Sequence, residues 1–123
     1  MPAASAALDV STPNAARAYD FLLGGKEAYE ADRQLVAAIE ALHPDSSLPR
    51  QMALKNRVFQ ERAVSQAVHD GCRQVLVAGS GFPRPRDLHH VALEARATSC
   101  AYLDIDPVVV SHGRVLTAEQ LFG

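Results

Sequence analysis

Two short stretches of this chain carry the residues best suited to bind a ligand. Gly79-Ser80-Gly81 directly follows the apolar run 74–78, and Asp104 directly follows the run 100–103. Glycines let a backbone turn approach a ligand closely, because no side chain stands in the way. A carboxylate at the end of a neighbouring strand can accept hydrogen bonds from both hydroxyls of a ribose. In this order and spacing, the two stretches predict a site for a nucleoside-bearing ligand.

Each half of this pattern has a simpler explanation when it is taken alone. The glycines could form a tight turn between a strand and a helix, and Asp104 could be a solvated strand end. A dinucleotide-binding turn has a third glycine, but Arg84 stands at that position here. The helix after the turn is expected to point free N–H groups at a carboxylate or phosphate. A nicotinamide-dependent oxidoreductase stays open as an alternative, although the missing glycine counts against it.

Helices are expected to position these residues from the amino-terminal side. Apolar residues recur at helical spacing over about 13–23, 28–42 and 48–69. Thr12 and Pro13 are expected to begin the first helix, and Gly24-Gly25 to end it. The expected buried stripes are Leu35, Val36, Ile39 and Leu42 in the second helix, and Met52, Leu54, Val58, Phe59, Ala63, Val64 and Val68 in the third.

After Gly71 the pattern changes to short strands that alternate with helices. We expect strands at 74–78, buried on both faces, and at 100–103. Asp87 is expected to cap the helix between them, and Asp106 to cap a helix from Pro107 to about residue 116, with a further capping box at 117–120. This order predicts an α/β fold of Rossmann-like type, preceded by helices.

The expected organisation is a flexible tail at 1–12, a helical extension at 13–71 and the first half of a Rossmann-like cofactor-binding domain at 72–123. Two parallel strands alone leave open edges and a poorly covered face. We therefore expect self-association, or a partner chain, through the open sheet edge.

Composition sets limits on the class of protein. The 123 residues fit one domain, and a hydrophobic content of 48% with 21% charged residues is ordinary for a soluble protein. A net charge of −2 gives no global attraction to nucleic acid or to an anionic membrane. No apolar run approaches the roughly 18 residues that cross a bilayer, and the start lacks a signal peptide, so the cytoplasm is the expected location. Cys72 and Cys100 are expected to be reduced packing thiols.

From Pro13 onward, the chain resembles bacterial S-adenosylmethionine-dependent methyltransferases that were formerly classed as a domain of unknown function. The string Tyr19-Asp20-Phe21-Leu22-Leu23-Gly24-Gly25-Lys26 is the most specific part of this resemblance. The other matching segments are Ala16-Arg17-Ala18, Asp32-Arg33, Asn56-Arg57-Val58-Phe59, Arg62-Ala63-Val64, Gly79-Ser80-Gly81-Phe82-Pro83, His89 and Asp104-Ile105-Asp106-Pro107-Val108-Val109.

The resemblance implies a class I methyltransferase with S-adenosylmethionine as its cofactor and a small molecule as its methyl acceptor. Gly79, Ser80 and Gly81 would wrap the methionine part of the cofactor, Asp104 would hold the ribose, and Ile105 would pack on the adenine. The loop formed by Gly24, Gly25 and Lys26 would close over the site. Methyl transfer depends mainly on alignment and desolvation, so no fixed catalytic residue is assigned.

Three departures from the family pattern bear on activity. Val77 stands where the family usually has an acid that helps to anchor the amino group of the ligand, and His90 stands after His89 where the family tends to have an acid. The match also covers only the first half of a typical member. A truncated, non-catalytic binding module that needs a partner chain is therefore an alternative function.

Other groups of polar residues are weaker candidates. Asp87, His89, His90 and Glu94 suggest a metal, but only two of them converge on one helix face, so no metal is expected. The loop Pro83-Arg84-Pro85-Arg86 could meet a phosphate, although a stiff exposed loop is favoured. Lys26, Asp20 and Asp32 form an ordinary surface charge cluster by their residue types, and only the family resemblance favours a role at the site.

Overall fold

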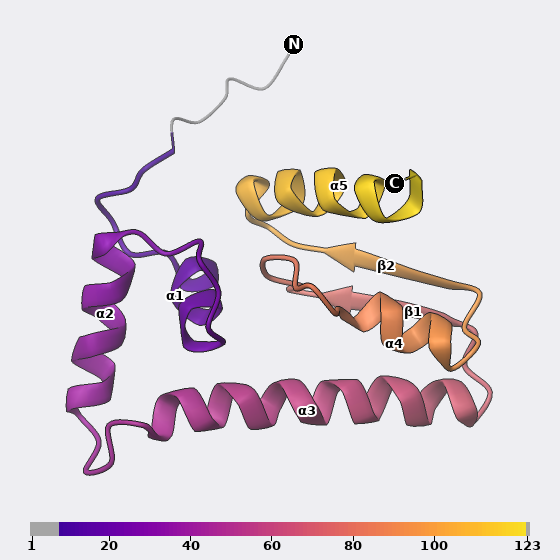
Figure 1. The fold of residues 1–123 in the computed structure, drawn as a ribbon, viewed down its shortest axis with the longest axis horizontal. Coiled ribbons are helices and arrows are strands. Elements are labelled where there is room, and N and C mark those ends of the chain that lie inside the picture. The colour runs from indigo at the N-terminus through magenta and orange to yellow at the C-terminus, as the bar shows by residue number, and fades with distance from the viewer. Residues whose placement is uncertain (1–7, 123) are drawn as a thin grey trace.

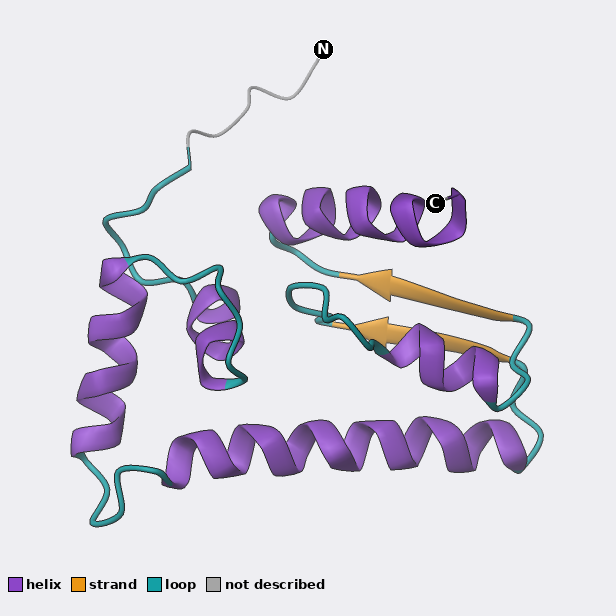
Figure 2. Cartoon of the chain, in the orientation of Figure 1, coloured by secondary structure: helices purple, strands orange, loops and turns teal. Residues whose placement is uncertain are grey.

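Residues 8–122 form three helices followed by two strands that alternate with two helices (Figures 1 and 2). A computed structural model describes the backbone of residues 8–122 and the side chains of residues 8–115; most of the predicted tail lies outside this part. The elements are α1 (Ala15–Leu22), α2 (Glu30–Ala41), α3 (Leu48–His69), β1 (Gln74–Ala78), α4 (Leu88–Glu94), β2 (Ser99–Leu103) and α5 (Pro107–Phe122). The predicted order of helices and strands is confirmed.

The start of α1 and the end of α5 differ from the prediction. Asn14, and not Thr12, is the N-cap of α1, because its side-chain oxygen accepts a hydrogen bond from the amide of Arg17. The predicted capping box at 117–120 does not begin a new helix, since α5 continues to Phe122. Asp106 caps α5 as predicted, with its Oδ1 accepting a hydrogen bond from the amide of Val108 at 2.9 Å.

The two strands are parallel, with Gln74 paired to Ser99 and Ala78 paired to Leu103 at the ends of the register. Helix α4 makes the crossover and packs on β2 and α3. A small core lies between these elements and is built on Val68, Ala92 and Ala97, against which Val64, Val75, Ala95 and Cys100 pack. The strand arrows in Figure 1 point toward α1, so α1 and α2 lie beyond the carboxyl ends of the strands, whereas α3 runs alongside α4.

The face of the sheet that points away from this core is not covered by any described side chain, and the prediction that β1 is buried on both faces is wrong. Every second residue of each strand is exposed, and the side chains of Leu76 and Leu103 are 67% and 59% accessible. The helical stripes are also only partly buried. Val36 and Val68 are buried, whereas Leu35, Leu42, Met52, Leu54, Val58 and Phe59 are exposed. An amphipathic pattern marks a face that needs cover, but the described residues do not supply that cover.

Two further features concern the chain as a whole. Cys72 and Cys100 are both free thiols, and burial, followed by the charge of Asp87, raises the pKa of Cys100. In the described residues, no helix has both the length and the apolar character needed to cross a membrane.

Candidate cofactor-binding site

A cavity of about 500 Å³ lies at the carboxyl ends of the two strands, between them and α1. Parallel α/β sheets commonly bind ligands at this edge, where the loops after the strands diverge. The lining includes α1, α3, the turn after β1 and the segment after β2. Its residues are Asn14, Ala15, Ala16, Tyr19, Asp20, Leu23, Arg57, Gln60, Val77, Ala78, Gly79, Ser80, Gly81, Phe82, Arg84, Leu88, Asp104, Ile105 and Asp106.

The glycine turn has the geometry expected of a ligand cradle. Gly79 and Gly81 have φ angles of +65° and +68°, in the left-handed region that residues with a Cβ rarely adopt. A Cβ built on either glycine would meet no atom within 4 Å, so both positions face open space. The amides of Gly79 and Ser80 donate to the carbonyl of Leu103, at 2.7 and 3.2 Å. The turn is therefore fastened to the end of β2.

Asp104 joins the two halves of the predicted site. Its Oδ2 accepts a hydrogen bond from the amide of Gly81 at 2.9 Å, and its Oδ1 accepts one from the amide of Asp106 at 2.9 Å. A carboxylate has about four acceptor positions, so these bonds leave capacity for ligand hydroxyls. Ile105 beside it is fully exposed. The acid thus orders the glycine turn whether or not it also binds a ribose.

The structure brings together five of the eight predicted cofactor-binding residues. Gly79, Ser80, Gly81, Asp104 and Ile105 all line the cavity. The other three, which form the loop of Gly24, Gly25 and Lys26, are absent from its lining, and α1 lies over it instead. The ligand contacts proposed for all eight residues stay predictions.

The helix after the glycine turn does not present free amides to it, contrary to the prediction. Helix α4 begins only at Leu88, and its N-cap Asp87 accepts a hydrogen bond from the Leu88 amide at 2.7 Å. The second oxygen of Asp87 accepts a bond from the Arg84 amide at 3.0 Å. These bonds occupy Asp87 in ordering the loop, so anion binding at this helix end has no support.

Seven polar residues that line the cavity were absent from the predicted site, namely Asn14, Tyr19, Asp20, Arg57, Gln60, Arg84 and Asp106. Arg84 departs most from expectation, because its side chain is only 21% accessible and lies 3.4 Å from Asp20, whereas a stiff exposed loop was predicted. Arg57 pairs with Asp87 at 3.1 Å. The sequence holds one signal for a role of Arg84, because this arginine stands where a dinucleotide-binding turn has its third glycine.

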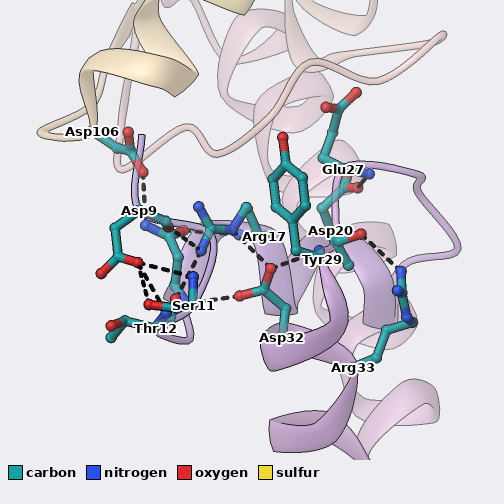
Figure 3. Close-up of polar contacts among 12 residues, drawn as sticks. Asp9, Ser11, Thr12, Arg17, Asp20, Glu27, Tyr29, Asp32, Arg33 and Asp106 are labelled. Atoms are coloured by element: carbon teal, nitrogen blue, oxygen red, sulfur yellow. Dashed lines mark hydrogen bonds and ion pairs between the residues drawn. The ribbon is translucent and has the colours of Figure 1, made fainter. Parts of the chain in front are cut away.

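Asp32 and Arg17 form a buried ion pair outside the cavity lining (Figure 3). The Nε of Arg17 lies 2.8 Å from Oδ2 of Asp32, and its Nη2 donates to the carbonyls of Thr12 and Asp9 at 2.9 and 3.2 Å. The amides of Asn14 and Tyr29 each donate to Asp32 at 2.8 Å. The prediction of a surface charge cluster is therefore wrong for Asp32, and also for Asp20, which is buried.

The pKa of Asp32 follows from this environment. Burial opposes ionisation, but the two amides and the Arg17 guanidinium together outweigh it and hold the pKa below its ordinary value of 3.8. The carboxylate is thus the stable form of this buried group at neutral pH, and it joins the start of α2 to the start of α1.

The histidines of α4 have structural hydrogen bonds. The amide of Asp87 donates to Nδ1 of His90 at 3.0 Å, and the amide of His89 donates to the hydroxyl oxygen of Tyr102 at 2.8 Å. Burial and then the charge of Asp87 raise the pKa of Tyr102. Across the described part of the chain, no three His, Cys, Asp or Glu side chains gather as a metal site would require.

These features define a class of protein: an α/β unit with a small parallel sheet and a cavity at the carboxyl ends of its strands. The family model described as S-adenosyl methyltransferase matches residues 1–123. The chain therefore belongs to this S-adenosyl methyltransferase family, as its resemblance predicted.

Two solved structures have similar folds. One is described as the "crystal structure of a putative methyltransferase" from Thermobifida fusca YX, with 40% identity and a TM-score of 0.78 over 90% of this chain. The other is a DUF574 family protein from Streptomyces avermitilis MA-4680, with 34% identity and a TM-score of 0.79 over 89% of this chain. The present chain spans only 41% and 42% of their respective lengths. No curated protein matches it.

Proposed function

We propose that this chain is the cofactor-binding half of a class I, Rossmann-like, S-adenosylmethionine-dependent methyltransferase whose acceptor is a small molecule. The observation that carries the proposal is the 2.9 Å hydrogen bond from the Gly81 amide to Asp104, which holds the glycine turn and the acid at one cavity. Membership of the S-adenosyl methyltransferase family supports the choice of cofactor over a nicotinamide.

The residues of the cavity fit this cofactor. Gly79 and Gly81 leave open space where a Cβ would stand, which suits close approach of the methionine part to the backbone. Asp104 has acceptor capacity for the ribose hydroxyls. The bound cofactor would supply a methyl group activated by its sulfonium sulfur. The chain's own contribution is to hold and orient the cofactor and to exclude water from it, which serves a reaction that depends on alignment.

A titration tests the proposal and separates the two cofactor classes. We expect S-adenosylmethionine, or its demethylated product S-adenosylhomocysteine, to bind more tightly than NAD. Asp104→Ala is expected to weaken this binding about tenfold or more, because it removes an acceptor for the ribose and loosens the Gly81 amide. Asp70→Ala removes an exposed aspartate at the end of α3, outside the cavity lining, and serves as the matched control. Tighter binding of NAD would reject the proposal.

A second candidate function is a non-catalytic cofactor-binding module that needs further polypeptide. The exposed Leu76 and Leu103 on the uncovered sheet face favour it, as does the chain's span of less than half of its matched structures. We propose that this face and the open edge of the sheet accept a partner segment. Cofactor binding without methyl transfer to any acceptor would favour this candidate, and transfer by the chain alone would reject it.

A further inference from the structure

Arg84 connects the loop after the glycine turn to the lead helix α1. Its Nη2 donates to the carbonyl of Leu23, the C-cap residue of α1, at 2.8 Å, and its Nη1 lies 3.4 Å from Oδ1 of Asp20. A cation at this position also suits the negative end of the helix dipole. One side chain thus holds both the end of α1 and a buried acid on it.

Asp20 is itself fixed from the other side by the loop that follows α1. Its Oδ2 accepts a hydrogen bond from the Glu27 amide at 3.1 Å, and its carbonyl accepts one from the Gly25 amide at 2.8 Å. A Cβ on Gly25 would overlap the Asp20 carboxylate, so only glycine permits this close approach. Asp20 therefore joins Arg84 to the loop of residues 24–27.

The opposite end of α1 has its own tie to the sheet. The side-chain amide of Asn14 donates to Oδ2 of Asp106 at 3.0 Å, and Asp106 caps α5. Helix α1 is thus held at both ends, to the loop after β1 and to the segment after β2. The cavity-lining residues Ala15, Ala16 and Tyr19 lie between these two ties.

We propose that the Arg84–Asp20 contact, which we call the clasp, holds α1 in place over the cavity. It thereby sets the affinity of the chain for the cofactor and the rate at which the cofactor dissociates. This inference rests on the proposed function, since it assigns a ligand to the cavity. Arg84 is a positioning residue: it acts through α1 and Asp20. Arg84 stands where a dinucleotide-binding turn has its third glycine. In this chain it links the turn to α1.

Variants of the two loop arginines test the clasp. Arg84→Ala is expected to weaken S-adenosylhomocysteine binding about tenfold and to speed its dissociation, because a partly buried charged hydrogen bond is lost. Without ligand, it should raise amide hydrogen exchange within residues 15–27. Arg86→Ala is the matched control, since Arg86 lies in the same loop and pairs with Glu94 on the exposed surface. It should change neither quantity.

The outcomes separate failure of the clasp from failure of the proposed function. A wild-type chain that binds no S-adenosylhomocysteine would reject the proposed function, while raised exchange confined to residues 15–27 in Arg84→Ala would still support the link. Equal affinity and equal exchange for Arg84→Ala and Arg86→Ala would overturn the clasp. If Arg84→Ala does not fold, Arg84→Lys decides: lysine presents a single ammonium group in place of the two-sided guanidinium, so affinity equal to wild type would overturn the inference.

Discussion

The lead segment, residues 9–41, and the strand pair of β1 and β2 differ in how completely the chain itself covers them. In residues 9–41, Asp32 has no accessible surface, and its hydrogen bonds all come from within the same segment. In the described part of the chain, every buried side-chain nitrogen or oxygen has a partner. The strand pair, in contrast, leaves Leu76 and Leu103 largely exposed on one face. One region is closed by polar contacts within the chain, and the other presents an apolar face without cover.

This difference follows from the directionality of the two kinds of interaction. A buried carboxylate needs donors at defined distances, and a short segment with its own caps and arginine can supply them. Apolar burial is not directional, so any suitable surface can cover Leu76 and Leu103. Contacts within this chain therefore set the stability of the lead segment, whereas the stability of the sheet face depends on what packs against it.

The largest expected effect comes from breaking the closed region. Asp32→Ala removes the acceptor for Arg17 and for the amides of Asn14 and Tyr29. Because this leaves a buried guanidinium without its partner, we expect a loss of about 3–5 kcal/mol in the free energy of unfolding. Urea denaturation followed by circular dichroism measures it. Glu30→Ala, which breaks an exposed ion pair with Arg33 in the same helix, should cost less than about 1 kcal/mol.

Acidification provides an independent check of the same ion pair. The pKa of Asp32 is lower in the folded chain than its ordinary value of 3.8, so its stabilising effect is fully present above that pH. The effect is lost as the pH falls through the lower folded pKa. The stability difference between wild type and Asp32→Ala should thus shrink below about pH 4. A difference that is small at pH 7, or that grows on acidification, would contradict a buried ionised pair.

The contrast between the regions also explains what the sequence could predict. The glycine turn, the acid after β2 and the bounds of α3 and β1 follow from local rules, because glycine, caps and short apolar runs act within a few residues. The roles of Asp20 and Arg84 could not be predicted in this way, since their contact joins positions 64 residues apart in the chain. Helical periodicity predicts stripes that are more buried than the structure shows, because it identifies an apolar face but not what covers that face.

A smaller effect, on the affinity for the cofactor, is expected at the wall of the cavity, where the two regions meet. Val77 contributes an apolar wall on the strand side, at the position where the family resemblance implies an acid for the amino group of the cofactor. Val77→Asp should tighten S-adenosylhomocysteine binding about tenfold, or about 1.4 kcal/mol, by adding a charged acceptor. Isothermal titration calorimetry measures the affinity. Val77→Asn, which is similar in size but uncharged, is the control and should gain less. Weaker binding with Asp would show that another group already holds the ammonium.

The smallest change in unfolding free energy is expected for a substitution on the exposed face of the sheet. The size of that change decides whether the face is exposed in solution. Leu103→Ser removes an apolar side chain that is 59% accessible, so it should change the unfolding free energy of a dilute monomer by less than about 0.5 kcal/mol. Val68→Ala, in the small core, should cost about 2 kcal/mol. If the face instead joins two copies of this chain, Leu103→Ser should shift sedimentation from dimer toward monomer, and the stability of the wild type should rise with protein concentration. A large, concentration-independent loss would mean that Leu103 is buried within a single chain, and the contrast between a closed and an open region would fail.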